Sequence, residues 1–274
     1  KYILFRGEGT ITNHIQGTGT VIGQANAASS IAVGAALYKN TPAYGVTPPT
    51  IASFSSRGGT LVDGVDRNKP DIVAPNGVNT TVNFGGVNID GDPFPNFFGT
   101  SAAAPHAAAV AALLIEAKQR YFEGTSFSAA EMKALLKTTA IPMDNSPVYA
   151  KSGDGFIQAD KALQSFSNSF PLIDSFHLQD PSKTPGTDPV TLVIDGGYIA
   201  PNAKVIFQYD TLQGVVSNGN QLVVQLPTFV GNPPLTIYNP SITTNGLDGG
   251  VSDSLYLLTA IPKKVKVKVN DAVK

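Results

Sequence analysis

An alanine-rich stretch from Ala102 to about Tyr121 constrains the fold more than any other part of the sequence. Its composition is typical of a helix, and its first half, residues 107–115, is apolar on every side. A helix without a polar face must be buried among other elements. The sequence therefore predicts a long core helix with strands or helices packed around it.

Short apolar segments and helical segments alternate over residues 1–166. A second helix is expected after Ser128, where Glu131 three residues later completes a capping box and Met132, Leu135 and Leu136 follow at helical spacing. This alternation predicts an α/β domain with a parallel sheet. Strands are expected at residues 3–5, 30–34, 71–74 and 156–157, and a closing helical turn at residues 159–163.

The character of the sequence changes beyond residues 167–171, where helix formers give way to short alternating segments separated by turn residues. Such a pattern is typical of a small all-β sandwich. We therefore predict one domain over residues 1–166, a second over 172–262, and the start of a further β module or linker over 263–274, where lysine and valine alternate. Five strands are expected in the second domain, at residues 190–194, 204–207, 221–226, 235–238 and 254–258.

Composition excludes several classes of function. The net charge is -1, which offers no electrostatic footprint for nucleic acid or an anionic membrane. No apolar run approaches the roughly 20 residues needed to span a bilayer, so we expect no membrane-spanning segment. Cysteine is absent, so disulfides and thiolate chemistry are excluded. No metal-ligand spacing or phosphate loop occurs, and the stretch Asn88–Asp92 is expected to be a turn. We predict no cofactor and no metal.

The segment Gly99-Thr100-Ser101 places a hydroxyl at the start of the long helix. The glycine permits a tight turn, and the helix N-terminus offers N–H groups that stabilise a developing oxyanion. Pro105 is expected near the first turn, where a missing N–H has little effect. The alternative reading is that Ser101 is an ordinary N-cap, the role in which serine is strongly favoured.

Residues 98–106, Phe-Gly-Thr-Ser-Ala-Ala-Ala-Pro-His, resemble the serine motif of the subtilase family of serine proteases. Other segments resemble the same family in the same order, over about residues 1–165. They are Ser30–Ala35, Ser53–Gly58, Lys69–Pro75, the helix of residues 128–140, and the closing segment Gly155–Leu163. The resemblance implies the C-terminal part of a subtilisin-like α/β catalytic domain that hydrolyses peptide bonds in a polypeptide substrate.

The same resemblance implies roles for particular residues. Ser101 would be the nucleophile, Thr100 would support the oxyanion, and Asn13 is a candidate for the second oxyanion donor, although an ordinary turn residue is an equal reading. Substrate binding would fall to Gly99 and to the strand that contains Ile3, Leu4 and Phe5, whose apolar character core packing explains equally well.

The family's Asp-[Ser/Thr]-Gly and His-Gly-Thr motifs do not occur in this sequence. His106 lies five residues along the helix from Ser101 and faces elsewhere, and neither His14 nor His177 is expected to act as the base. We therefore expect the chain alone to be nearly inactive and to need the N-terminal part of its catalytic domain as a partner. The alternative is a non-catalytic bacterial surface or adhesion protein with a degenerate subtilase scaffold.

Residues 172–262 resemble the immunoglobulin-like modules called IPT or TIG. The segments that match are Ile173–Phe176, Asp195–Val205 and Leu235–Pro240. This resemblance implies an immunoglobulin-like sandwich that serves as a spacer or displays the protein for adhesion. Together with the abundance of Gly, Pro, Asn, Thr and Ser, it favours a secreted or bacterial cell-surface protein.

Overall fold

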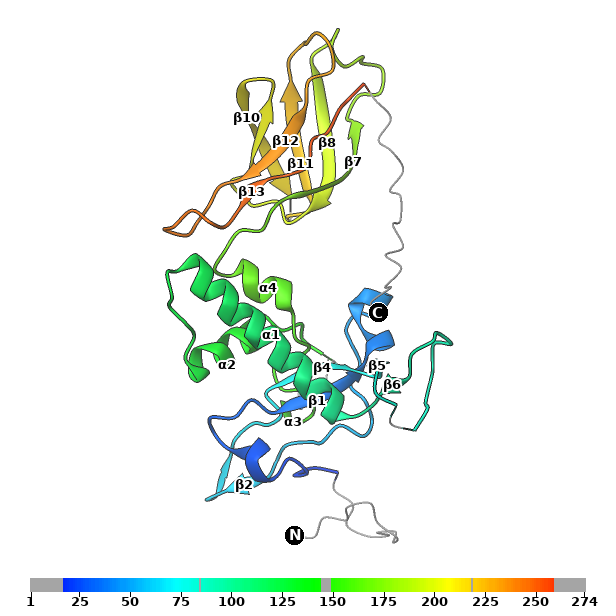
Figure 1. Ribbon diagram of the computed structural model, residues 1–274, viewed down its shortest axis with the longest axis vertical. Coiled ribbons are helices and arrows are strands. Elements are labelled where there is room, and N and C mark those ends of the chain that lie inside the picture. The colour runs from blue at the N-terminus through cyan, green and yellow to red at the C-terminus, as the bar shows by residue number, and fades with distance from the viewer. Residues whose placement is uncertain (1–16, 84, 144–148, 218, 259–274) are drawn as a thin grey trace. The chain divides into compact units, whose positions relative to one another are not determined.

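The computed structural model describes residues 17–83, 85–143, 149–217 and 219–258 (Figure 1). The chain divides into two compact units, Lys1–Ser165 and Phe166–Lys274. Each unit has a hydrophobic core of its own. The strand expected at residues 3–5 and the alternating segment 263–274 lie outside the described residues.

A parallel pair of strands forms the centre of the first unit. β1 (Val33–Leu37) lies beside β4 (Ile72–Asn76) in a register that places Val33 opposite Ile72 and Leu37 opposite Asn76. Residues of both strands are fully buried, as expected for parallel strands with both faces covered. The strands predicted at residues 30–34 and 71–74 are therefore present, but both begin and end later than predicted.

Other segments cover both outer edges of this pair. On the outer side of β4, Val73 donates its N–H to Gly155 O at 2.7 Å and accepts at its carbonyl from the Ile157 N–H at 2.9 Å. On the outer side of β1, the Ala35 N–H donates to Ser55 Oγ at 3.0 Å, and the Ala35 carbonyl accepts from Ala52. The strand predicted at residues 156–157 is thus reduced to single bridges of Phe156 to Val73 and Ile141.

The long helix α1 (Thr100–Tyr121) contacts β1, β4 and the short helix α4 (Ala159–Gln164). Only Ala102, Ala103, Ala107 and Leu114 of α1 are buried, whereas Leu113 is 62% exposed. The prediction of a helix buried on every side is therefore wrong for this structure. Two strands about 4.8 Å apart offer too narrow a surface to cover more than one face of a helix about 10 Å wide.

In the part of the chain that the structure describes, α1 is also the one helix long and apolar enough to cross a membrane, by length and composition alone. This differs from the expectation that no apolar run approaches the length needed to span a bilayer. It is weak evidence for a membrane, because the core helix of a water-soluble domain meets the same criteria, and one face of α1 packs on β1 and β4.

The second helix confirms its predicted cap. Ser128 is the N-cap of α2 (Ala129–Thr138), its side chain accepts from the Glu131 N–H, and the Glu131 carboxylate accepts from the Ser128 N–H at 2.8 Å. Met132 and Leu136 are buried, and the exposed residues are alanines together with Glu131 and Thr138. The amphipathic character read from the sequence is therefore present.

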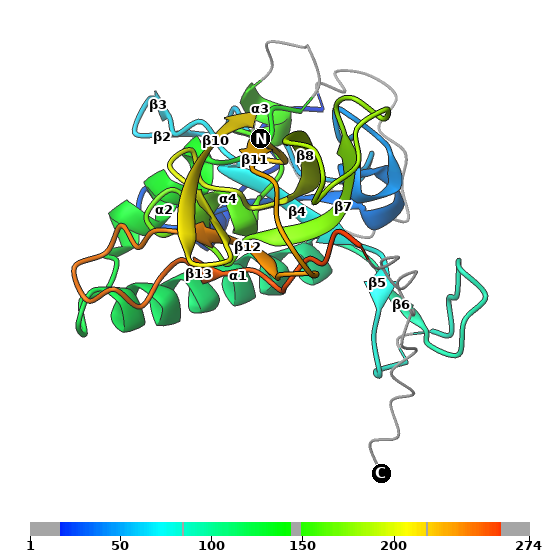
Figure 2. The same ribbon diagram turned by 90° about the horizontal axis from the view of Figure 1, so that it is seen from above.

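A short antiparallel pair connects the end of β4 to the start of α1. β5 (Val78–Asn79) pairs with β6 (Asn96–Phe97), so the residues that follow β4 lie against those that precede α1. Figure 2 shows this pair at one end of α1. The remaining elements of the unit are β2 (Leu61–Val62), β3 (Val65–Asp66), α3 (Tyr149–Ser152) and the 3-10 helices Gly23–Asn26, Tyr38–Asn40 and Pro42–Tyr44.

A buried ion cluster joins three segments of the first unit. Asp71, which is 1% exposed, accepts from Lys69 Nζ at 2.6 Å and from the Ala32 N–H at 2.7 Å, and its other oxygen lies 2.8 Å from Lys133 Nζ on α2. Both lysines also donate to Ser30 O. Burial lowers the pKa of the Lys69 ammonium, and its contact with Asp71 opposes that effect. The cluster ties β4 to α2 and to the loop before β1.

The second unit is a single curled antiparallel sheet of seven strands in the order β13-β12-β9-β10-β11-β8-β7. Alternate residues of its central strands point into one hydrophobic core, which includes Leu192, Val205, Leu222 and Ile237. The strands are β7 (Leu172–Leu178), β8 (Val190–Gly197), β9 (Lys204–Phe207), β10 (Asp210–Ser217), β11 (Gln221–Leu226), β12 (Leu235–Asn239) and β13 (Gly250–Val251).

Four of the five predicted strands are present as β8, β9, β11 and β12. The fifth, residues 254–258, forms only a bridge between Leu255 and Leu235. β10 was not predicted, because the turn before it contains neither glycine nor asparagine; Gln208 adopts the positive φ of 57° instead. The seven strands are hydrogen-bonded as one sheet, so the two packed sheets expected of an immunoglobulin fold stay a prediction.

Two buried polar side chains hold the loops of the second unit. Asn239, with no exposed surface, accepts from the Ala200 N–H at 2.9 Å and donates to the carbonyls of Ser169 and Tyr198. Asp248 accepts from the Asn168 N–H at 2.7 Å and from the backbone and hydroxyl groups of the loop that follows β12. Burial by itself raises the pKa of Asp248, but these hydrogen bonds outweigh it and hold the pKa below its ordinary value.

Replacing Asp71 by asparagine should destabilise the first unit. The change leaves the buried Lys69 ammonium and the partly buried Lys133 ammonium without their carboxylate. Breaking a buried ion pair in this way typically lowers the free energy of unfolding by about 3–5 kcal/mol. Urea unfolding followed by the helical circular dichroism signal measures the loss. The matched control is Asp154→Asn on the exposed pair with Lys137, which should lose less than about 1 kcal/mol. Equal losses in the two variants would contradict the structural role of the cluster.

The stability of the second unit should depend on the ionisation of Asp248. Because its pKa is lower in the folded than in the unfolded state, its ionised form stabilises the fold above about pH 4, and this contribution is lost as the pH falls further. Hydrogen exchange of β12 should therefore be slower in the wild type than in Asp248→Asn at neutral pH, with the difference narrowing in acid. A difference that does not change with pH would refute this assignment.

Candidate active site

Ser101 is the second residue of α1, and its side chain is exposed. The N–H groups of Ala102 and Ala103 bond to Gly99 O at 3.0 and 3.3 Å. Helix geometry leaves the N–H groups of Thr100 and Ser101 without a partner inside the helix. An exposed hydroxyl thus stands beside free N–H groups at the positive end of a 22-residue helix.

Gly99 occupies the N-cap position of α1 with φ of 117° and ψ of 170°. An L-residue rarely adopts this φ, so glycine is required by conformation rather than by lack of space. Because Gly99 is the N-cap, Ser101 is not, and the structure does not support the reading of Ser101 as an ordinary cap. The glycine turn presents the hydroxyl at the surface of the first helical turn.

Pro105 lies inside α1 as its sixth residue, which differs from the expected position near the first turn. A proline there cannot donate to the carbonyl four residues back, which belongs to Ser101. The next residue, His106, lies 2.7 Å through Nδ1 from Ala102 O. Since a carbonyl only accepts, this Nδ1 donates. The contact directs the ring along the helix and agrees with a structural role for His106.

Of the residues that the sequence singled out, the structure brings together Gly99, Thr100 and Ser101. Ile3, Leu4, Phe5 and Asn13 lie outside the described residues, as does His14. His177 belongs to the second unit, where its Nδ1 lies 3.5 Å from Asp195 Oδ2. The described part of the first unit therefore provides the turn and the hydroxyl of the predicted site, and its one histidine, His106, is bonded to the helix backbone.

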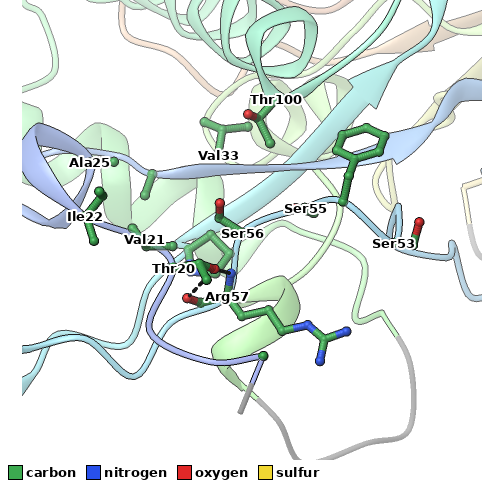
Figure 3. A pocket seen from close by; sticks show the side chains of 14 residues that line it. Thr20, Val21, Ile22, Ala25, Val33, Ser53, Ser55, Ser56, Arg57 and Thr100 are labelled. Carbon is green, nitrogen blue, oxygen red and sulfur yellow. Dashed lines mark hydrogen bonds between the residues drawn. The ribbon is translucent and has the colours of Figure 1, made fainter. Parts of the chain in front are cut away.

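A pocket of about 660 Å³ opens next to the first residue of α1. Figure 3 shows Thr100 and Val33 on one side of it and the Arg57 side chain extending away from Thr100. On the far side of the pocket, Thr20 Oγ1 accepts a hydrogen bond from the Arg57 N–H at 2.7 Å, which joins the segments around these two residues. Ser101 itself is not part of the lining, which is formed by Gly17, Thr20, Val21, Ile22, Ala25, Ala32, Val33, residues 53–57, Pro70 and Thr100.

The sequence analysis assigned no role to Asn76, the last residue of β4, or to Gly77, which follows it. The Gly99 N–H donates to Asn76 Oδ1 at 3.4 Å, and the Gly77 N–H donates to Phe97 O at 2.9 Å. Asn76 is 1% exposed. A polar residue that ends an apolar strand is a signal that could have pointed to this contact.

The loop Asn88–Asp92 is a hydrogen-bonded turn. Asn88 Oδ1 accepts from the Gly91 N–H at 2.7 Å, and Asp90 accepts from the Tyr38 hydroxyl at 2.7 Å. The hydrogen bonds from Tyr38 and Asn96 hold the pKa of Asp90 below its usual range. No group of three or more His, Cys, Asp or Glu side chains suited to a metal ion occurs in the described ranges. The structure of Asn88–Asp92 therefore agrees with the turn predicted from the sequence.

Comparison with known proteins identifies the family of the first unit. Residues 7–172 match the model of the subtilase family of peptidases. Subtilisin-like protease SBT2.1 of Arabidopsis thaliana is 30% identical over 191 residues, which are 66% of this chain and 21% of that protein. Subtilisin-like protease SBT4.12 of the same plant is 36% identical over 118 residues, which are 40% of this chain and 14% of that protein. The chain spans about a fifth or less of the length of these relatives.

Two solved structures show weaker likeness. The patellamide maturation protease PatA is 22% identical with a TM-score of 0.36, over 50% of this chain and 43% of that one. A lanthipeptide protease is 23% identical with a TM-score of 0.37, over 49% of this chain and 40% of that one. Such low scores do not bear on the details of the fold. The match over residues 7–172, which contains the glycine turn and Ser101, establishes that the chain belongs to the subtilase family.

Proposed function

We propose that this chain is part of a serine endopeptidase and contributes its nucleophile, Ser101. The observation that supports this most directly is the position of the hydroxyl, exposed on the first turn of α1 behind a glycine with φ of 117°. A serine that served only the helix would occupy the N-cap, where Gly99 stands instead. Family membership agrees with serine protease chemistry in general.

In the proposed reaction, Ser101 Oγ attacks the carbonyl carbon of a peptide bond while a base outside this chain takes the hydroxyl proton. The Ser101 N–H, left unpaired by the helix, stabilises the oxyanion, and Thr100 supports it. Asn13 is the proposed second donor. Gly99 and the segment that includes Ile3, Leu4 and Phe5 bind the substrate. The base then returns its proton to the leaving amine.

The aspartate and histidine of the triad are proposed to come from residues outside this chain. The motifs that contain them in subtilases are absent from the sequence. Nδ1 of His106 is occupied by the Ala102 carbonyl. Loss of a triad member lowers turnover by about four to six orders of magnitude, so the chain alone should be nearly inactive.

The second unit is proposed to be an immunoglobulin-like module of the IPT or TIG type that serves as a spacer or displays the protein for adhesion. Its antiparallel strands and the buried Asn239 in the Asn-Pro segment support this assignment. With such a module, the protein is proposed to be secreted or held at a bacterial cell surface. No cofactor takes part in the proposed chemistry.

A fluorophosphonate probe tests the nucleophile. In the complete gene product, the probe should modify Ser101, as located by mass spectrometry of the labelled peptide. Labelling of the 274-residue chain should be slower by roughly a thousandfold or more, because the base is missing. Ser101→Ala should abolish labelling, whereas the control Ser126→Ala, which removes another exposed serine, should leave it unchanged.

Two outcomes would overturn the proposal. Equal labelling of the chain and the complete gene product would mean that no external base is required. Absence of labelling at Ser101 in a gene product that also lacks the Asp-[Ser/Thr]-Gly and His-Gly-Thr motifs would instead identify a non-catalytic surface protein built on a subtilase scaffold.

A further inference from the structure

We infer that Asn76 is a positioning residue for Ser101, acting through the backbone of Gly99. This inference deepens the proposed function and rests on it. Asn76 is the last residue of β4, and Ser101, 25 positions later, is the second residue of α1. The link between them is the hydrogen bond from the N–H of Gly99, two residues before Ser101, to Asn76 Oδ1.

The glycine turn needs an external restraint. Glycine populates more of the backbone map than any other residue, so Gly99 does not by itself hold the following residues in one place. A nucleophile must be held within about 0.5 Å of its productive position. The N-cap also lacks a side chain that could bond to the first turn. The position of the hydroxyl therefore depends on what fixes the Gly99 backbone.

The end of β4 supplies that restraint at two levels. The Gly77 N–H donates to Phe97 O at 2.9 Å, and Asn96 Nδ2 donates to Gly77 O at 3.1 Å, which fixes the residues just before the turn. A Cβ on Gly77 would lie 2.6 Å from Leu37 Cδ1 and 2.9 Å from Phe98 Cε1, so these two side chains pack directly against the glycine. The Asn76 side chain then reaches one step further, to the Gly99 N–H itself.

The environment of Asn76 indicates that the acceptor oxygen of its side chain is the reason for a polar residue at this buried position. The residue is 1% exposed, and its Nδ2 has no hydrogen-bond partner in the described part of the chain. Burial of an unpaired donor is unfavourable, and an aliphatic side chain would fill the same place without that disadvantage. The contact that the amide makes toward Ser101 is the one from Oδ1 to Gly99.

The Asn76–Gly99 bond is long at 3.4 Å, compared with the usual 2.9–3.0 Å. Its effect on stability should accordingly be small, while its effect on where the hydroxyl stands should be large. Hydrogen bonds of catalytic sites are often long before substrate is bound and shorten in the reacting complex. This contrast between stability and reactivity separates a positioning role from a merely structural one.

Two variants with the same number of side-chain heavy atoms as asparagine test the inference. Asn76→Asp keeps an acceptor oxygen, removes the unpaired donor, and places its charge near the positive end of α1. Asn76→Leu keeps the branched shape and removes the acceptor. In the complete gene product, fluorophosphonate labelling of Ser101 should fall by at least about tenfold in Asn76→Leu, as expected when a reacting group is displaced, and stay within about threefold of wild type in Asn76→Asp. Asn26→Leu, at another buried asparagine of the same unit, should leave labelling unchanged.

The second readout does not depend on activity. In the 274-residue chain, the amide proton of Gly99 should exchange with solvent faster in Asn76→Leu than in the wild type, and its NMR signal should shift upfield. In Asn76→Asp, the exchange rate and the chemical shift of this proton should stay close to the wild-type values. If wild-type Ser101 reacts with the probe but Asn76→Leu reacts equally fast, the positioning role is refuted while the proposed function stands. If Ser101 does not react in the wild type, the proposed function fails, and an unchanged Gly99 signal in Asn76→Leu would refute the contact as well.

Discussion

The parallel pairing of β1 with β4, over five residue pairs, forms the centre on which the other elements of the first unit pack. Parallel pairing buries both strands, and α1 packs one face against them. The loops at 52–55 and 155–157 complete the outer edges by hydrogen bonds to Ala35 and Val73. The exposed face of α1 is the physical consequence of so narrow a sheet, since two strands can cover only one side of a helix.

The two ends of β4 make different polar contacts, an ion cluster just before its first residue and a hydrogen bond to the backbone before α1 at its last. At its start, Asp71 collects two lysine ammonium groups and ties the strand to α2 and to the loop before β1. At its end, Asn76 and Gly77 contact the backbone that leads into α1. One strand thus joins the buried ion cluster of the unit to the turn that presents Ser101. A charge cluster thus lies just before the strand, and a contact with the turn before Ser101 lies at its other end.

The second unit shows the same use of buried polar groups on a different scaffold. Asn239 and Asp248 satisfy backbone groups of loops that no strand pairing reaches. Such groups would otherwise be buried without partners, at a cost of about 1–3 kcal/mol each. The alternation of apolar residues that predicted the strands could not predict these loops, because their conformation depends on side-chain contacts between residues distant in sequence.

The sequence by itself determined the family, the long helix that follows the Gly-Thr-Ser motif, the capping box of α2 and four strands of the second unit, since each depends on neighbouring residues. Tertiary structure alone decided that α1 is buried on one face, that β10 follows a turn without glycine or asparagine, and that Asn76 contacts Gly99. Local pattern specifies periodicity and caps, but exposure and contacts depend on which distant segments are present to pack. For that reason the Gly-Thr-Ser motif could be recognised in the sequence, whereas the contact of Asn76 with the Gly99 N–H could be identified only in three dimensions.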